Sequence, residues 1–477
     1  MTWDDHGGAL RLTVGEGVER VVGGLDADPE AWLALDHGVR EACRDAARNP
    51  GHTRWRALRE LRPREGAYAP PALAFALCHG DGRIREKALK EAEARPEALP
   101  LVVVRCADWA GPVRLRARGL LRRMLTVERA VALTPLVLRL GHRAQGATAV
   151  GLVRDALRSV SAGELRPLLR HPNRRVRRFA VELALSAGLF TAPELARTAA
   201  GDPDVVVQDL CADAALAAFP EDEAARGAVL EPLLTARNSR ARATGVTALR
   251  RAGRPGRAEA FLTDRSPVVR ACARWVLREH GIDPLPRYRA LCADPSDPAV
   301  PRGAPAGLAE CGGREDAPLL RPLLAHPAPA VRAAAVAALR RLDALDRAEL
   351  RPLLDDPSAA VVREAATALL PDARALDPDV LSRMLEPGGP PHRRRAAFRL
   401  LAAHGGLPAL RAAVDLLDSP DEPTRDRAAR CLATWEPPPD LPRGDPEVAA
   451  LIEASRDRIP RSRLPFLVWA TGVGPAR

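Results

Sequence analysis

The chain has 477 residues, of which 47% are hydrophobic but only 3% aromatic, so Ala, Leu and Val must supply its core. Its 72 Lys and Arg outnumber 61 Asp and Glu, which gives a formal net charge of +11. No sustained alternation of β-branched or aromatic residues indicates a sheet, and the abundant Ala and Leu are strong helix formers. The composition therefore predicts an all-α protein.

Eight scattered cysteines form no CxxC pair, which excludes a zinc layout and a disulfide framework. The first residues, MTWDDHGGAL, lack the basic start of a signal peptide. The longest late apolar run, LPFLVWATGVG, is too short to cross a bilayer. We therefore expect a cytoplasmic protein with no membrane span, metal or cofactor.

Residues 1–64 are predicted to form an N-terminal helical cap. Residues 30–49 (EAWLALDHGVREACRDAARN) read as one amphipathic helix and residues 52–64 (HTRWRALRELRPR) as another. Neither carries the phrase that recurs in the rest of the chain. A cap of this kind supplies the polar outer face that the end of a repeat array requires.

Residues 65–436 repeat one phrase about every 31 residues, as in HPAPAVRAAAVAALRRLD (326–343). A first helix ends in a Leu-Leu pair, an Asp-Pro or His-Pro turn follows, and a second helix opens on an apolar anchor. A degenerate unit is expected around 141–157, and the last two anchors match poorly. The anchors are Ile84, Val113, Val176, Val207, Ala241, Val269, Val300, Val331, Val361, His392 and Thr424.

One such helical pair cannot cover its own apolar faces, so neighbouring pairs must stack on it. The proline of the Leu-Leu segments either lies in a first turn or kinks the helix. The predicted fold is a right-handed α-solenoid, an α-α superhelix of about twelve helical hairpins with a period near 31 residues.

This unit resembles the HEAT repeat, most closely the short form found in phycobilisome lyases, over roughly residues 65–436. The resemblance implies a scaffold and says little about chemistry. In similar proteins, an Asp in the turn and an Arg at the start of the second helix form a ladder between stacked repeats.

Arg follows the anchor by one or two places in ten of the eleven units, and the Val207 unit is the exception. The arginines are Arg85, Arg114, Arg177, Arg242, Arg270, Arg302, Arg332, Arg363, Arg393 and Arg425. The turn before the anchor holds an acid or a histidine: Asp108, Asp202, Asp264, Asp294, Asp356, Asp418, His79, His171 and His326. Either the arginines bond turn carbonyls and the neighbouring Asp, or they line a groove for an acidic partner.

The positive charge is concentrated between Arg105 and Arg257, interrupted by the acidic unit 201–223. This basic region would attract a protein or nucleic acid, although the interruption argues against one continuous phosphate track. The candidate partner- or phosphate-binding residues are Arg114, Arg116, Arg118, Arg174, Arg175, Arg177, Arg178, Arg237, Arg240, Arg242, Arg250 and Arg251.

Residues 437–477 are expected to form a Pro-rich linker, a helix and an apolar tail. WEPPPDLPRGDP (435–446) reads as a stiff spacer, and EVAALIEASRDRI (447–459) reads as a helix. The tail from Pro460 either folds back on the repeats or remains free to bind a partner.

No catalytic residue is indicated, because the chain has no Walker loop, GxSxG, HExxH or dinucleotide fingerprint. The enzymatic rival is a HEAT-like alkylpurine DNA glycosylase, which holds damaged DNA in a basic groove with aromatic side chains and an acid. Asp108 and Trp109, with the arginines after them, are the nearest such constellation, and Asp264 with Trp275 is a second. Aromatic stacking platforms are nevertheless scarce.

The predicted function is therefore non-enzymatic binding of a macromolecule, with a protein partner favoured and no small-molecule substrate indicated. Nucleic-acid binding through the Arg-rich middle repeats is the alternative.

Overall fold

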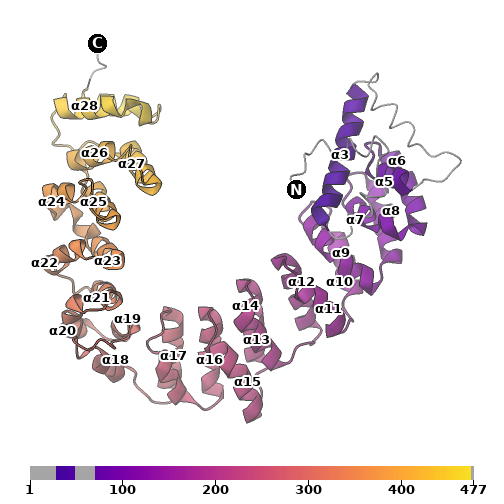
Figure 1. The fold of residues 1–477 in the computed structure, drawn as a ribbon, viewed down its shortest axis with the longest axis horizontal. Coiled ribbons are helices and arrows are strands. Elements are labelled where there is room, and N and C mark those ends of the chain that lie inside the picture. The colour runs from indigo at the N-terminus through magenta and orange to yellow at the C-terminus, as the bar shows by residue number, and fades with distance from the viewer. Residues whose placement is uncertain (1–27, 49–69, 474–477) are drawn as a thin grey trace. The chain divides into compact units, whose positions relative to one another are not determined.

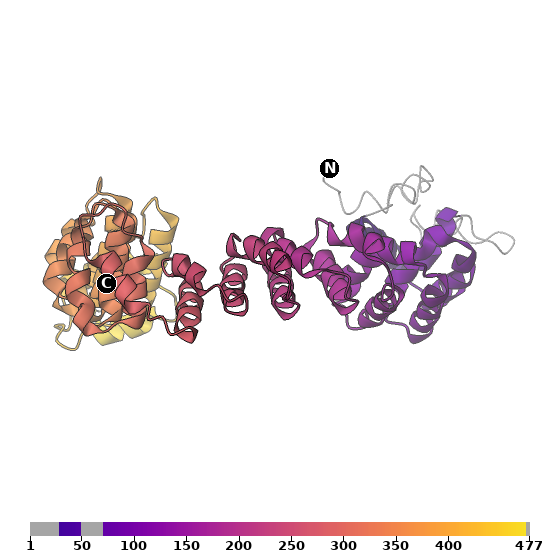
Figure 2. The same ribbon diagram turned by 90° about the horizontal axis from the view of Figure 1, so that it is seen from below.

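The computed structural model describes residues 28–48 and 70–473, and these residues form helices and connecting turns without a strand. Contacts divide the chain into two compact units, residues 1–245 and 246–477. Within each unit, helices that follow one another in the chain pack side by side (Figures 1 and 2). The predicted α-solenoid is confirmed.

In the first unit, long helices alternate between the two layers of the stack. They are α3 (Pro29–Arg48), α5 (Pro70–Cys78), α6 (Gly82–Glu91), α7 (Leu99–Arg105), α8 (Gly111–Met124), α9 (Val127–Leu140), α10 (Ala147–Ala156), α11 (Ala162–Leu169), α12 (Arg174–Ser186), α13 (Ala192–Gly201), α14 (Val205–Ala217) and α15 (Glu223–Leu234). Helix α16 (Ser239–Arg251) crosses the boundary between the units.

In the second unit, the first helix of each pair is often shorter. The helices are α17 (Pro267–Glu279), α18 (Leu285–Cys292), α19 (Gly303–Cys311), α20 (Ala317–Leu320), α21 (Pro329–Arg341), α22 (Arg347–Leu350), α23 (Ala359–Leu369), α24 (Pro378–Arg383), α25 (Pro391–His404), α26 (Gly406–Asp415), α27 (Glu422–Thr434), α28 (Pro446–Ala454) and α29 (Leu464–Thr471).

Two of these short helices end at the proline of a Leu-Leu segment. In the second unit, Pro322 and Pro352 end α20 and α22, and the chain continues as 3-10 turns at Pro322–Ala325 and Arg351–Asp355. In the first unit, Pro167 and Pro232 lie inside α11 and α15, which remain α-helical. Proline removes a helical hydrogen bond, and the longer helices of the first unit accommodate that loss.

Local signals fix where the helices begin. Ser161 and Glu164 form a reciprocal capping box at the start of α11, and the Asn173 side chain accepts the Arg175 N–H at the start of α12. These side chains satisfy backbone donors that have no partner within the helix. The turn residues therefore both end one helix and begin the next.

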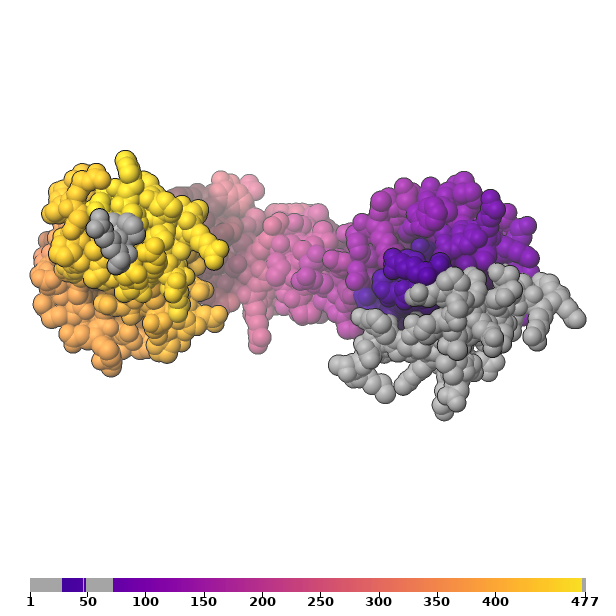
Figure 3. Space-filling model, turned by 90° about the horizontal axis from the view of Figure 1, so that it is seen from above, coloured from indigo at the N-terminus to yellow at the C-terminus, as the bar shows by residue number. Residues whose placement is uncertain are grey.

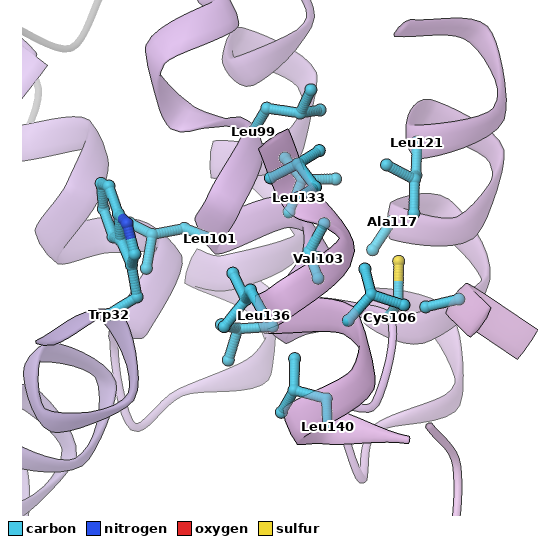
Figure 4. Packing of buried hydrophobic residues seen from close by; sticks show 14 of the residues in the cluster. Trp32, Leu99, Leu101, Val103, Cys106, Ala117, Leu121, Leu133, Leu136 and Leu140 are labelled. Carbon is cyan, nitrogen blue, oxygen red and sulfur yellow. The ribbon is translucent and has the colours of Figure 1, made fainter. Parts of the chain in front are cut away.

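Small apolar side chains fill the cores, as the composition predicts. Figure 4 shows Leu101 and Val103 of α7 packed among Leu133 and Leu136 of α9 in the first unit. Trp32 of α3 joins the same cluster, so this first described helix packs on the repeats. The anchors other than Val300 lie in the second helices, and most are buried, although Ile84 and His392 are only partly so.

The unit at 141–157 and the unit of Val300 depart from the regular repeat. The degenerate unit at 141–157 does form a helix, α10, which packs on α9. The expectation that Val300 opens a second helix is wrong, because α19 begins at Gly303. Pro301 follows Val300 directly and disfavours helix at the residue before it.

The two ends of the described chain are helical. The helix expected at 30–49 is α3, whereas the helix expected at 52–64 lies outside the described residues. After the Pro-rich stretch, α28 is followed by α29, whose Leu467 packs into the core of the second unit. Across the parts of the chain that the structure describes, no helix is long and apolar enough to span a bilayer.

Candidate functional site

The turn between the two helices of a repeat holds a side chain that accepts the backbone N–H two residues further along the chain. The Asp108 carboxylate accepts the Ala110 N–H at 2.9 Å, and the His171 Nδ1 atom accepts the Asn173 N–H at 3.0 Å. The same bond occurs at His79, Asp202, Asp264, Asp294, His326 and Asp356. Asp and His therefore do the same work here, and the histidine Nδ1 must be unprotonated to accept.

The arginine six residues after the turn acceptor binds back to its own turn. Arg177 Nη1 donates to the carbonyl oxygens of His171 and Pro172, at 2.9 Å each. Turn carbonyls are held in this way by Arg85, Arg114, Arg177, Arg242, Arg270, Arg332 and Arg425. These bonds fix the angle between the two helices of one repeat.

The remaining nitrogens of several of these arginines bind the turn acid of the next repeat. Arg85 donates to Asp108 from Nε at 2.9 Å and from Nη2 at 2.7 Å. Arg177 binds Asp202 at 3.1 and 3.2 Å, and Arg332 binds Asp356 at 2.8 Å through both nitrogens. This fork geometry matches a carboxylate with two parallel bonds. A ladder of ion pairs thus links successive repeats.

Other side chains replace the ladder pair in some units. In the repeat of Val207, Gln208 stands in place of the ladder arginine. Its side chain donates to the Asp202 carbonyl oxygen and accepts a hydrogen bond from Asn238 at 2.7 Å. Arg270 binds Glu310 together with Arg274. Arg363 is exposed and lies 3.5 Å from the adjacent Glu364, because Val362 occupies the ladder position in that repeat.

Asp108 lies in a buried cluster of charges. Its carboxylate accepts from Arg85, from Arg105 at 3.1 Å and from Arg40 at 3.3 Å. Burial by itself raises the pKa of Asp108, but the hydrogen bond from Arg85 and the charge of Arg105 outweigh it, and the net pKa is lowered. The structure therefore places Asp108 in the packing between repeats, with the exposed Trp109 ring beside Arg85 at 5.6 Å.

Five of the twelve candidate arginines have their guanidinium groups committed within the repeats. They bind turn carbonyls, turn acids or the neighbouring repeat: Arg114, Arg118, Arg177, Arg178 and Arg242. These residues are buried or half-buried. Their geometry favours the ladder interpretation over the groove interpretation.

Three further candidates form exposed ion pairs between successive second helices. Arg116 lies 3.5 Å from Glu86, Arg240 lies 3.3 Å from Asp213, and Arg250 lies 3.2 Å from Glu279. Arg250 also covers the Trp275 ring at 5.3 Å. Arg237 and Arg251 are exposed as well.

The acidic unit 201–223 neutralises the basic units on either side of it. Asp204 binds Arg178 at 2.8 Å through both oxygens. These bonds, with the backbone N–H bonds that the carboxylate accepts, outweigh the opposing effect of burial and lower the pKa of Asp204 to about 2. Asp209 and Asp213 face Arg240 on the other side. Much of the positive charge counted in the sequence is thus already paired.

Arg174 and Arg175 differ from the other candidates. Both are exposed at the start of α12, and neither lies within ion-pair distance of an acid among the described residues. Arg166 and Arg170 of the preceding segment are exposed in the same way. On the adjacent helix α14, Val205 and Val206 are 59% and 40% exposed.

Sequence reasoning missed the buried partners of the ladder. Arg105 and Asp36 pair in the interior, although neither belongs to the recurring phrase. Glu310, which binds two arginines, lies 40 residues after Arg270 and outside its expected place. Of these pairs, only Gln208–Asn238 could have been suspected from the sequence, since Gln208 stands where the repeat pattern places an Arg. Within the described residues, no group of three or more His, Cys, Asp or Glu is placed to hold a metal ion.

Residues 285–371 match a family model described as HEAT repeats. No curated protein matches the chain. The solved structure of YibA from Escherichia coli is 18% identical, with 60% of this chain and 96% of that chain covered and a TM-score of 0.25. Importin beta is 13% identical, with 98% and 67% covered and a TM-score of 0.33.

A structure of microtubule polymerases with TOG-domain arrays, solved to explain tubulin recruitment and assembly, is 12% identical. That match covers 89% of this chain and all of the other, with a TM-score of 0.23.

Proposed function

The chain is a HEAT-repeat protein, and we propose that it is a non-enzymatic scaffold that binds a protein partner on the exposed residues of its second helices. The observation that carries the proposal is the division of the arginines into two classes. Five of the twelve candidates bind groups within the repeats and three more form ion pairs between them. Arg174 and Arg175 are instead exposed at the start of α12, and Val205 and Val206 are exposed at the start of the neighbouring α14. Unpaired arginines next to apolar side chains are typical of protein interfaces, where Arg is enriched.

The test is capture of a partner by the immobilised full chain from an extract treated with nuclease. Arg174→Ser with Arg175→Ser is expected to reduce capture at least tenfold, because two interface cations are removed. The matched control is Arg427→Ser with Arg430→Ser, two exposed and unpaired arginines of α27, which should leave capture unchanged. Both variants should keep the wild-type melting temperature, since exposed substitutions typically change stability by less than about 0.5 kcal/mol.

Equal capture by the Arg174/Arg175 variant and the wild type would contradict this binding surface. If proteins are captured only from untreated extract, and none from the extract treated with nuclease, their capture depends on nucleic acid. That result would contradict the scaffold function.

Nucleic-acid binding is a second candidate function, and it is favoured by four arginines that have no acid within ion-pair distance in the part of the chain that the structure describes. Arg166, Arg170, Arg174 and Arg175 cluster around the turn between α11 and α12. If each contacts one phosphate, log K should fall against log [salt] with a slope of about −3.6. Filter binding of a short DNA duplex at low and moderate salt measures this slope. The absence of retention at low salt would exclude the candidate.

A further inference from the structure

Helix α29, the last described helix, presents an aromatic face to solvent. Its Leu467 is buried in the core of the second unit, whereas Phe466 is 39% exposed and Trp469 is 69% exposed. The two rings lie beside each other, with centroids 6.2 Å apart. Figure 3 shows the C-terminal residues, in yellow, at the surface of this unit.

Helix α28 packs on α26, and α29 is the last helix among the described residues. The polar side chains of the Pro-rich stretch do not cover the rings: Arg443 instead donates to the Trp469 carbonyl oxygen at 3.1 Å. Two adjacent exposed aromatic rings are an apolar patch of the kind that marks an interaction site.

Two arginines, Arg443 and Arg463, contact the two aromatic residues. Arg463 lies over the Phe466 ring at 4.2 Å, and Arg461 is exposed without an acid in ion-pair distance among the described residues. One acid, Glu436, faces Arg463 at 3.9 Å. Arg456 and Arg458 are already paired with Glu453 and Asp418. Arg443 and Arg463, which contact the two aromatic residues, are thus opposed by one ion-paired acid, Glu436.

We propose that Arg443, Arg461, Arg463, Phe466 and Trp469, here called the terminal patch, bind an acidic segment of a protein partner. A leucine or aromatic side chain of that segment would pack on the two rings, and its carboxylates would pair with the arginines. The proposal rests on the scaffold function and names the chemistry of one partner.

Charge argues against a second copy of the chain as the occupant. A two-fold contact would bring the terminal patch of one copy onto the same patch of another, and like charges would face each other. The small size of the patch also favours a short segment, because a stable protein interface buries about 800 Å² on each side. Affinity in the micromolar range is expected for such a contact.

The experiment is fluorescence polarisation of the full chain with a fluorescein-labelled peptide in which pairs of glutamate alternate with pairs of leucine. The comparison peptides carry lysine in place of glutamate, or serine in place of leucine. The first peptide should bind, and each comparison peptide should bind at least tenfold more weakly. Trp469→Ser should reduce the affinity at least tenfold, whereas Trp469→Phe should retain most of it.

Trp109→Ser is the matched control, since Trp109 is 71% exposed in the other unit and should not affect peptide binding. The proposal is overturned if the acidic peptide does not bind, or if it binds the Trp469→Ser variant equally well. It is also overturned if the chain alone sediments as a dimer that Trp469→Ser dissociates, or if phosphatidylserine vesicles retain the wild type but not that variant. Partner capture through Arg174 and Arg175 can persist after any of these results, so failure of the terminal patch is distinct from failure of the scaffold function.

Discussion

At the turn position of the described repeats, three aspartates bind an arginine of the preceding repeat, whereas two histidines do not. Asp108, Asp202 and Asp356 each accept the N–H two residues on and also bind an arginine of the repeat before. His171 and His326 accept the same N–H, but no arginine of a preceding repeat donates to them in the described structure. A neutral histidine can accept the N–H of the turn, whereas a carboxylate can accept that N–H and also bind the arginine of the preceding repeat.

Replacing His171 with Asn is expected to weaken the pH dependence of stability. Burial lowers the pKa of His171, and the charge of Arg177 lowers it further, so the folded state favours the neutral ring. Its contribution to stability is therefore complete above the unfolded pKa of about 6.5 and is lost as the pH falls through the lower folded pKa. Asn accepts the same N–H without titrating.

Urea unfolding of the wild type and His171→Asn between neutral and mildly acid pH measures this difference. An unchanged loss of stability on acidification in the variant would show that His171 does not contribute to it.

Removing a ladder arginine should cost far more than removing an exposed one. Arg332→Ala leaves the largely buried Asp356 carboxylate without its partner, and we expect a loss of about 3 kcal/mol in the free energy of unfolding. Arg363→Ala, in the next repeat, should cost less than about 0.5 kcal/mol because that side chain is 67% exposed. Chemical denaturation of both variants checks the contrast, and equal losses would refute the ladder as a source of stability.

Among the elements, the pair α18 and α19 departs most from the common repeat. Tyr288 of α18 is fully buried, and its hydroxyl donates to the Leu262 carbonyl oxygen at 2.6 Å. A Cβ atom at Gly307 of α19 would overlap the Tyr288 ring. The glycine therefore allows the two helices to approach closely around a residue larger than the usual Ala or Leu.

Gly307→Ala is expected to destabilise the second unit by about 1–3 kcal/mol, because the buried and hydrogen-bonded Tyr288 ring cannot withdraw. Gly227→Ala is the matched control: this glycine lies inside α15 with no atom within 4 Å of the added Cβ. The control should be neutral or stabilising by up to about 1 kcal/mol, since Ala favours helix. Thermal unfolding compares the two, and a neutral Gly307→Ala would contradict the close contact.

Across the whole molecule, stability is distributed between neighbouring repeats. Helices pack on those next to them in sequence, as α13 does on α14 and α15, and each ladder pair joins adjacent repeats. Arrays built in this way behave approximately as a sum of repeat and nearest-neighbour terms. A local defect should therefore remain local.

Arg85→Ala is expected to increase amide hydrogen exchange in α5 to α8 and leave α21 to α25 unchanged. The substitution removes a fully buried partner of Asp108 in the first unit, whereas those later helices belong to the second. Hydrogen-exchange mass spectrometry of the full chain measures both regions. A uniform increase over the chain would indicate one cooperative body.

The sequence alone predicts the repeat and much of its detail, because the relevant signals are local. Helical spacing, the Leu-Leu pair, the Asp-Pro or His-Pro turn and the anchor all lie within one period of about 31 residues, and each follows from backbone preference. The prediction failed at Val300, because Pro301 directly after it disfavours helix there and α19 begins only at Gly303. The domain limits and the list of binding arginines stay predictions.

What the sequence could not decide is the role of each arginine, since that depends on a partner in another repeat. Arg177 follows its anchor by one place and binds Asp202 of the next repeat, whereas Arg363 follows its anchor by two places and is exposed. A shift of one residue within the second helix turns the side chain by about 100° and separates these outcomes. The sequence thus determined that helical hairpins stack. The tertiary structure determined which charged side chains pair between stacked repeats and which remain exposed to a partner.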